Sequence, residues 1–283
     1  MLIVDSFPWM RFFFPAYYRY LNHGSELQKF FQEQIDEHNA RLDGIRAEKT
    51  NNFIDAYLVR IKEQNNGAAI SPAQRFTLAV DTGDLWTGGM ETVVTTLTWA
   101  VLYLIHYPEV QAKLQRELDE QLADKPFSMN DRSRLPYMCA TIDELQRIVN
   151  VLPWHIPHAN TKQVSIAGKL IPAGTNIMLQ IGAVLYDEYL FPLADTFMPE
   201  RFLEEKNTIY NPSKYLKPFG MGKRKCIGES LAKMELSIVF ASLIQNFTSK
   251  QPTLSICQVW LVCLEWLPKP TVLSAELNKE QPN

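Results

Sequence analysis

The sequence has few of the features that mark disulfide-rich and zinc-binding proteins. Its 283 residues include only four cysteines, at positions 139, 226, 257 and 263. They are too few and too widely spaced for a disulfide framework or a paired-cysteine zinc site. The sequence therefore predicts free thiols and a reducing compartment.

The chain also lacks a strong charge of either sign. Its 28 lysines and arginines stand against 31 acidic residues, a formal net charge of -3. So small a charge gives no general attraction to nucleic acid or to an anionic membrane, and any charged partner must meet a local patch. The basic run Lys214 to Lys225 is one such patch, and we expect no nucleic-acid partner.

No uninterrupted apolar run is long enough for a signal peptide or a membrane span at the start of the chain. Residues 1–18 are rich in aromatic side chains, but Asp5, Pro8 and Arg11 interrupt them. The aromatic residues between positions 7 and 18 fit contact with a membrane interface, where such rings are favoured. Packing against the chain's own core is the alternative, and the sequence leaves both open.

Apolar residues at helical spacing dominate the rest of the chain. A capping pattern at Ser25 and Gln28 predicts a helix starting near Ser25, and Ser71 with Pro72 predicts the start of a long helix that continues through residues 76–107. Further helices are expected over 108–122, 136–149 and 227–247, the last with an apolar face made of Ala232, Leu236, Val239, Leu243 and Phe247.

The remaining segments contain little regular structure. β-branched residues and glycine turns predict two or three short strands over 162–181, and residues 187–225 read as irregular. No internal repeat is visible. The fold class is therefore mainly α with a small β portion, and we expect a single domain over residues 1–283.

One cysteine has unusual surroundings. In PFGMGKRKCIG, residues 218–228, Cys226 follows Lys223, Arg224 and Lys225 and stands at the start of a helix, which favours a thiolate. Glycines on both sides of it permit close approach of a flat group. A nucleophile, a zinc ligand and a haem ligand are the chemistries open to it, and a basic surface loop is the plain alternative. A zinc site would need further ligands at short spacing, and none occur here. Haem binding needs only one thiolate, backbone that a flat ring can approach closely, and cations for the haem carboxylates.

Five motifs, in order, carry a resemblance to a known family. The cysteine segment fits F-x-x-G-x-R-x-C-x-G, and it is preceded by GGMET at 88–92, ELQR at 144–147, the Pro157-His158 pair and FMPERF at 197–202. The chain thereby resembles the latter part of the cytochrome P450 superfamily, in its microsomal branch for xenobiotics, fatty acids and steroids. The fold implied is a long central helix, an ExxR helix, a short sheet, a meander, the cysteine loop and a final helix.

The resemblance implies how haem b would be held. Cys226 would be the axial thiolate ligand of the iron. Phe219 would pack beside the ligand, Gly222 and Gly228 would allow close approach of backbone and helix, and Arg224 and His158 would bind the haem carboxylates. For His158, an ordinary turn histidine is the alternative.

The resemblance implies further roles elsewhere. Glu91 and Thr92 would relay protons on the oxygen side of the iron, beside the bend allowed by Gly88 and Gly89, although Thr92 read alone is an ordinary helical threonine. Glu144, Arg147 and Arg201 would give structural support. A mostly apolar substrate pocket would include Trp86, Gly88, Leu152, Trp154 and Ile156, with a core position as the alternative for Trp154.

The implied function is a haem-dependent monooxygenase that inserts one oxygen atom of O2 into a small hydrophobic substrate. NADPH would supply electrons through a flavoprotein reductase docked on Lys214, Lys217, Lys223 and Lys225, unless these lysines are only a solvated patch or a targeting-like cluster. We expect the cytosolic face of the endoplasmic reticulum membrane, or the cytoplasm if the chain is unanchored. Because the match covers only the latter part of the family's fold, the alternative is a truncated, non-catalytic product with weak or no haem binding.

Overall fold

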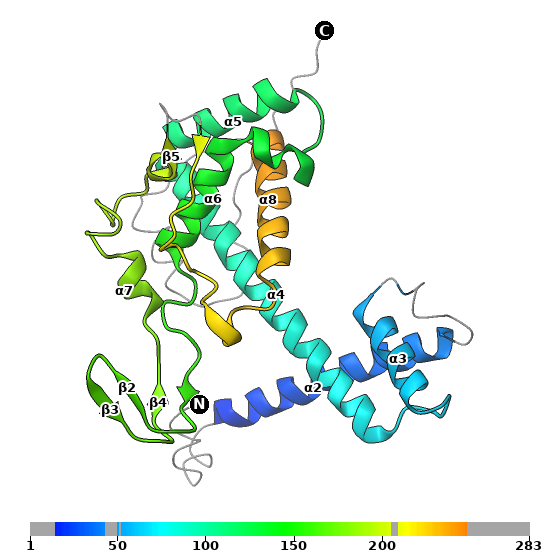
Figure 1. Ribbon diagram of the computed structural model, residues 1–283. Helices are drawn as coiled ribbons and strands as arrows, with labels where there is room; N and C mark the ends of the chain where they lie inside the picture. The colour runs from blue at the N-terminus through cyan, green and yellow to red at the C-terminus, as the bar shows by residue number, and fades with distance from the viewer. Residues whose placement is uncertain (1–14, 43–49, 51, 205–208, 248–283) are drawn as a thin grey trace. The chain divides into compact units, whose positions relative to one another are not determined.

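The computed structural model describes residues 15–42, 50, 52–204 and 209–247. The chain divides into two compact units, residues 1–91 and 92–283, and the boundary falls inside one long helix. The helices and strands, drawn in Figure 1, are α2 (Pro15–Arg41), α3 (Phe53–Gln64), α4 (Pro72–His106), α5 (Pro108–Leu122), η3 (Met129–Arg134), α6 (Pro136–Val149), β1 (His158–Ala159), β2 (Val164–Ile166), β3 (Lys169–Ile171), β4 (Asn176–Ile177), α7 (Ile181–Leu185), η4 (Pro199–Phe202), β5 (Leu203–Glu204), β6 (Ile209–Tyr210), η5 (Gly222–Arg224) and α8 (Glu229–Asn246).

The first unit is helical in its described part. Its core is formed by apolar side chains of α2, α3 and the beginning of α4: Phe31, Ile35, Leu42, Leu58, Val59, Leu78 and Ala79. The predicted helix start at Ser25 is wrong, because α2 already begins at Pro15. The Ser25 hydroxyl donates to the carbonyl of Asn22 at 2.7 Å, a bond that a serine inside a helix can make without ending it.

The start of α4 is confirmed at the predicted cap. The Ser71 hydroxyl accepts the backbone N–H of Gln74 at 3.2 Å, and the Gln74 side chain accepts the N–H of Ser71 at 3.0 Å. These two bonds form the reciprocal capping box expected from Ser-Pro-x-Gln. The helix then continues without a break through both central glycines.

By length and composition α4 satisfies the requirements for crossing a membrane, and 11% of its most apolar 18-residue window is buried. Core helices of soluble proteins meet the same requirements. Glu91 lies in the middle of this helix, where a charge in lipid would be costly. Length and composition alone therefore do not place α4 in a bilayer.

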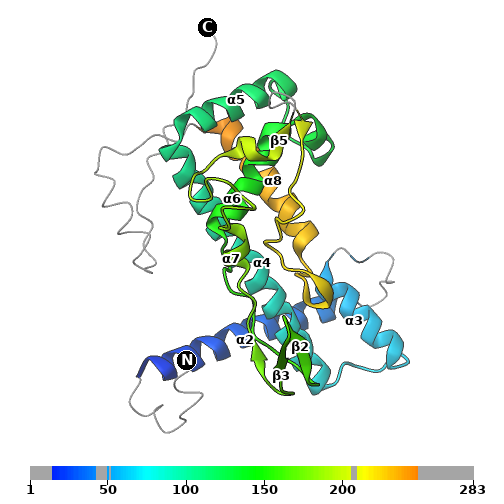
Figure 2. The same cartoon turned by 60° about the vertical axis from the view of Figure 1, so that its left-hand side comes forward.

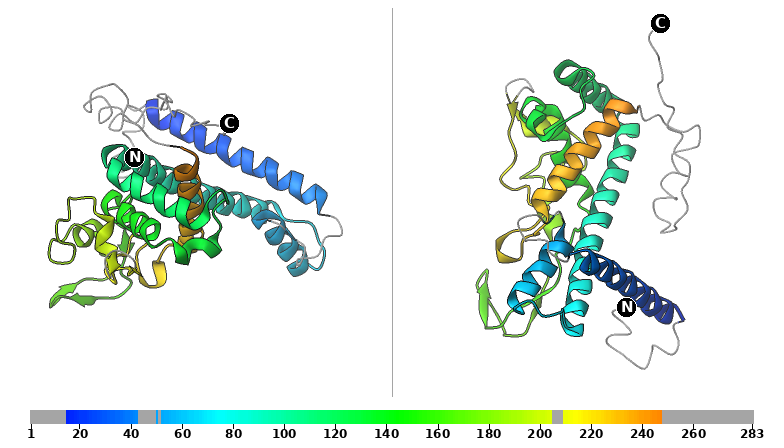
Figure 3. Two further views of the ribbon diagram at one scale, coloured as in Figure 1. Left: turned by 90° about the horizontal axis from the view of Figure 1, so that it is seen from above. Right: turned by 90° about the vertical axis from the view of Figure 1, so that its right-hand side faces the viewer.

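The second unit packs the end of α4 with α5, α6 and α8. The helix predicted over 108–122 is confirmed as α5, and its apolar stripe of Val110, Leu114, Leu118 and Leu122 is buried in this core. In Figure 3, α8 lies beside the second half of α4, and Leu236 and Phe240 of α8 line a small void together with Thr96, Leu97 and Ala100 of α4. Burying this common apolar surface contributes about 25 cal/mol per Å2 to stability.

The apolar face predicted for α8 is partly wrong. The buried residues include Leu236, Phe240 and Ile244 at steps of four, whereas Val239 is 40% exposed. The predicted face took one step of three, from Leu236 to Val239, and then followed the neighbouring row of the helix. Helix ends were predicted more accurately, within two residues of the observed 229–246.

The β portion of the described chain consists of antiparallel pairs, β1 with β4, β2 with β3 and β5 with β6. The β2–β3 hairpin, with Val164 opposite Ile171, lies next to β4 in Figure 1 and is seen from another side in Figure 2. Strands were predicted over residues 162–181, and β2, β3 and β4 fall there. β1, β5 and β6 lie outside that range, and each is only two residues long.

Candidate functional site

The cysteine loop, residues 217–228, is closed by its own backbone. The N–H of Cys226 donates to the carbonyl of Phe219 at 3.0 Å, and the N–H of Gly220 donates to Lys217 at 3.0 Å. The short η5 turn lies between these bonds. The loop therefore holds its shape through main-chain bonds and leaves the thiol of Cys226 exposed.

The structure requires glycine at only one of two predicted glycine positions, Gly222 and Gly228. Gly222 has φ +76°, a left-handed conformation, and a Cβ there would meet nothing within 4 Å. A Cβ at Gly228 would lie 3.9 Å from the sulfur of Cys226. A side chain at Gly222 would therefore strain the loop, whereas one at Gly228, where φ is -88°, would only make an ordinary van der Waals contact with the thiol.

An ion-pair group at the start of α8 supports the loop. Glu229 binds Lys225 at 2.6 Å and Lys233 at 2.7 Å, and the ammonium of Lys233 lies 5.6 Å from the centre of the Phe219 ring. Burial acts to raise the pKa of Glu229, but the hydrogen bonds from the two lysines hold it below its usual value. The Lys233 ammonium thus links the start of α8 to the Phe219 ring of the loop.

The predicted basic patch is exposed at all four lysines. Lys225 is nevertheless paired with Glu229, and the ammonium of Lys214 lies 4.9 Å from the centre of the Tyr215 ring. Arg224 is also exposed. The surface around the cysteine therefore carries a local positive charge that Glu229 reduces but does not cancel.

His158 lies in β1, opposite Ile177 of β4. Its ring is 5.0 Å from that of His155, centre to centre, with 33° between the ring planes. Nε2 of His155 lies 2.8 Å from the place a Cβ on Gly220 would occupy. His155 was not among the predicted site residues, and nothing in its local sequence marks it, since Gly220 is distant along the chain.

In α4 the first unit ends at Glu91 and the second begins at Thr92. Glu91 is exposed, and Thr92 is half-buried. The backbone carbonyl of Thr92 accepts the hydroxyl of Thr96 at 2.8 Å, a bond that competes with regular helix bonding. A Cβ at Gly88 or at Gly89 would meet nothing within 4 Å. The glycines therefore do not serve close packing inside their own unit.

The anchor cluster, which we define as Glu144, Arg147 and Arg201, is brought together in the second unit. Arg147 donates twice to Glu144, at 2.8 and 2.9 Å, and both side chains are fully buried. Arg201 of η4 binds the same carboxylate at 3.0 Å with 6% of its side chain exposed. Such two-pronged pairing is strong where water is excluded.

The anchor cluster also holds the chain between α7 and η4. Arg147 donates to the carbonyl of Leu185 at 2.8 Å, while Arg201 donates to those of Pro192 at 2.7 Å and Leu193 at 3.0 Å. The bonds to Arg201 stabilise the segment around Leu193, whose φ of +56° is unusual for a residue with a side chain. One buried acid and two arginines thereby organise an irregular segment.

The residues predicted for a substrate pocket fall in both units. Trp86 and Gly88 are exposed in the first unit. The ring centres of Trp86 and Phe31 are 6.0 Å apart. In the second, Trp154 is 61% and Ile156 66% exposed, and Leu152 is exposed as well. The alternative of a core position for Trp154 is thus wrong. Whether these five side chains share a pocket stays a prediction.

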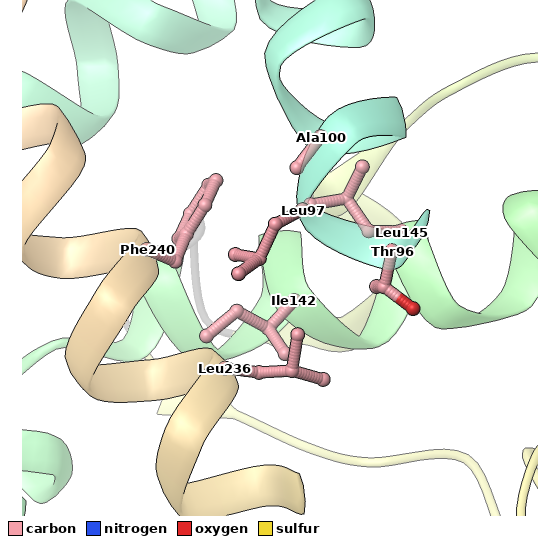
Figure 4. Close-up of a pocket in the computed structure, with 7 residues that line it drawn as sticks. All are labelled: Thr96, Leu97, Ala100, Ile142, Leu145, Leu236 and Phe240. Atoms are coloured by element: carbon pink, nitrogen blue, oxygen red, sulfur yellow. The ribbon is translucent and has the colours of Figure 1, made fainter. Parts of the chain in front are cut away.

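A void in the second unit lies between α4, α6 and α8. It is lined by Thr96, Leu97, Ala100, Ile142, Leu145, Leu236 and Phe240 (Figure 4). Its volume of about 10 Å3 is at the lower limit for one water molecule. This void is a packing defect of the core and is too small for a cofactor or substrate.

The residues of the cysteine loop fit an iron porphyrin chemically. An exposed thiol supplies one soft ligand, and the open space at Gly222 allows a flat ring to approach the backbone. Arg224 and His158 are hydrogen-bond donors suited to carboxylates. Among the described residues no group of three or more His, Cys, Asp or Glu side chains could hold a metal ion, so a chelating site of that kind is not a competing use.

Comparison with known proteins agrees with this donor set. The 3-ketosteroid oxygenase of Caenorhabditis elegans is 37% identical over 251 residues, which is 87% of this chain and 42% of that protein. Cytochrome P450 2C5 of Oryctolagus cuniculus is 36% identical, over 87% of this chain and 49% of its own length. Cytochrome P450 2C15 of the same species is 36% identical, over 87% of this chain and 63% of its own length.

The chain therefore spans about half the length of most of the curated relatives it matches. A sequence model of one family, described as Cytochrome P450, matches residues 1–259. This match covers well over half of the chain and includes the anchor cluster and the cysteine loop. The chain belongs to the cytochrome P450 family.

Proposed function

We propose that the protein acts as a haem-thiolate monooxygenase that places one oxygen atom of O2 into a small hydrophobic substrate. The proposal rests on one observation: the cysteine loop combines an exposed thiol, a glycine backbone with open space beside it, and exposed cations. Haem would supply the binding and reductive activation of O2. The chain's own residues would hold and orient that group.

Each residue of the loop has a separate task in this proposal. Cys226 would bind the iron through its sulfur, and Phe219 would shield that sulfur from water. Arg224 and His158 would each donate hydrogen bonds to a haem carboxylate. The anchor cluster would keep the segment from α7 to η4 in place and so stiffen the scaffold that carries the loop.

Glu91 and Thr92 would handle protons on the opposite side of the ring. They are adjacent in α4, Glu91 exposed and Thr92 half-buried, so Glu91 would exchange protons with water and Thr92 would pass them on in a partly shielded position. Gly88, one turn earlier, would leave room for a bound group beside the helix. The apolar side chains of Trp86, Leu152, Trp154 and Ile156 would favour a hydrophobic substrate.

The electrons would come from NADPH through a flavoprotein reductase. Lys214, Lys217 and Lys223, exposed on and near the cysteine loop, would attract an acidic docking face of that partner. We propose the cytosolic face of the endoplasmic reticulum membrane as the location, as in the microsomal branch. Most of the aromatic segment 7–18 lies outside the described residues, and its membrane contact remains part of the proposal; Tyr18 is 46% exposed.

The proposal is tested by measuring oxygen insertion directly. The protein, loaded with haem and mixed with a reductase, NADPH and a panel of steroids and fatty acids, is exposed to isotopically labelled O2. One labelled oxygen atom in the product supports the proposal, and loss of product in Cys226→Ala assigns it to the thiol. Haem binding without any labelled product would favour the non-catalytic alternative.

A further inference from the structure

His155 and His158 place two imidazole rings side by side next to the cysteine loop. Their ring centres are 5.0 Å apart, although residues three apart on an extended strand point to opposite faces. Pro157 lies between them and interrupts the regular alternation. The two side chains are thus brought to one side by the irregular backbone.

The backbone of this segment is fixed independently of the rings. The N–H of His155 donates to the carbonyl of Leu179 at 2.8 Å, and His158 pairs with Ile177 in the β1–β4 ladder. Both imidazoles are half-buried. The backbone that carries both rings is therefore fixed before any ligand binds, which reduces the entropy lost on binding.

His155 also contacts the cysteine loop directly. Its Nε2 atom fills the place that a side chain on Gly220 would need, at 2.8 Å from the Cβ position. Gly220 has φ +73° and follows Phe219, whose carbonyl accepts the N–H of Cys226. The ring of His155 consequently lies against the loop that carries the thiol and Arg224, and the ring of His158 lies beside that of His155.

The chemistry of the surroundings favours an anion over a metal ion. No third His, Cys, Asp or Glu joins the two histidines to make a metal-binding group in the described part of the chain, and a tetrahedral site needs at least three protein ligands. The neighbouring loop exposes Lys223, Arg224 and Lys225, and within the described ranges an acidic partner is present for Lys225 alone of these three. A carboxylate accepts one N–H on each oxygen, which two imidazoles can provide.

We propose that His155 is a second carboxylate-binding histidine of the porphyrin site, acting beside His158 on the same edge of the cysteine loop. This inference rests on the proposed function, because it requires a porphyrin with free carboxylates as the ligand. It adds a binding residue that the motif alone does not contain. It also gives Gly220 a role, since a side chain there would displace the ring of His155.

The test compares two probes that differ only in their carboxylates: metal-free protoporphyrin IX and its dimethyl ester. Neither contains iron, so binding, followed by fluorescence, does not depend on the thiolate. We expect His155→Gln and His158→Gln each to weaken binding of the diacid about five- to tenfold and to leave the ester unchanged. His106→Gln, which changes an exposed histidine at the end of α4, is the matched control.

The result that overturns the inference is an equal effect of His155→Gln on both probes, or no effect beyond that of His106→Gln. A wild-type protein that does not bind the diacid more tightly than the ester overturns it as well. Gly220→Ala should reproduce the loss for the diacid, and adding His155→Gln to it should cause little further change. The proposed function is tested separately. Cys226→Ala should keep the preference for the diacid, because neither probe contains iron. A haem-loaded wild type without thiolate ligation would contradict the proposed function but not the role of His155.

Discussion

Glu144, Arg147 and Arg201 in the anchor cluster are buried and bonded to one another, whereas Cys226 and Arg224 in the cysteine loop are exposed. Both regions concentrate charge or reactivity, but the first pairs its charged groups with one another in the interior, whereas the second pairs Lys225 with Glu229 and leaves its thiol in solvent. A cluster that is satisfied internally gives rigidity, since disturbing it leaves a buried charge without a partner. An exposed thiol with cations beside it is available to a ligand. The anchor cluster therefore supports the fold, and the cysteine loop is the region available to a ligand.

The largest expected effect comes from breaking the anchor cluster. Glu144→Ala would leave Arg147 fully buried and Arg201 nearly so without their shared carboxylate, and we expect a loss of about 3–5 kcal/mol in the free energy of unfolding. Urea denaturation followed by circular dichroism measures it. A loss below about 1 kcal/mol, the range of exposed pairs, would contradict the supporting role.

A change at the glycines of α4 should act in the opposite direction. A Cβ at Gly88 meets nothing within 4 Å, so Gly88→Ala should stabilise the helix by about 1 kcal/mol. If α4 passes a bound group there, the same variant should also bind haem more weakly. Thermal unfolding and haem titration measure the two effects, and a variant that is both more stable and unchanged in haem affinity would remove the functional reason for glycine.

The ion pairs beside the cysteine loop should contribute less than the anchor cluster. Glu229→Gln removes the charge that pairs with Lys225 and Lys233, whose side chains are 50% and 36% exposed, and we expect a loss of about 0.2–1 kcal/mol at neutral pH. Because the folded-state pKa of Glu229 is lowered, this contribution is present above the ordinary glutamate pKa and is lost as the pH falls through the lowered value. Unfolding measured at neutral and acid pH should therefore show the gap between wild type and variant closing in acid.

The smallest expected effect is at Asp143, a buried acid outside the anchor cluster that accepts the hydroxyl of Tyr210. Burial raises the pKa of Asp143 in spite of this bond and the nearby Lys233 and Arg132. Such a group contributes stability below its unfolded pKa and loses it as the pH rises through the folded value. Asp143→Asn should thus be slightly more stable than wild type at neutral pH, with the difference vanishing in acid. A variant less stable at neutral pH would show that the charged form is the favoured one.

The contrast also explains what the sequence could predict. Helices α5 and α6 were located at both ends, since Pro108 and Pro136 mark their starts and their apolar spacing is regular. The start of α2 was missed because a serine bonded to a preceding carbonyl looks like a cap in sequence. In α8, two adjacent rows of apolar residues were equally consistent with the sequence, and only packing against α4 and α6 selects between them.

For the candidate site, the residues close to Cys226 in the chain and the family resemblance predicted more than the helical spacing of apolar residues did. The loop around Cys226 was identified from glycines and cations close to it in the chain. The link from Arg201 to Glu144 follows from resemblance, because no periodicity relates residues so far apart. The contact of His155 with Gly220 could not be predicted at all, since it forms only when β1 and the cysteine loop are folded.

The central claim is that the sulfur of Cys226 binds haem iron. The most direct measurement is the absorption spectrum of the haem-loaded protein, reduced and exposed to carbon monoxide, for wild type and for Cys226→His. We predict the red-shifted Soret band of thiolate ligation in the wild type and its replacement in Cys226→His by the band of histidine-ligated haem. An identical band in both proteins, or no thiolate band in the wild type, would contradict the account.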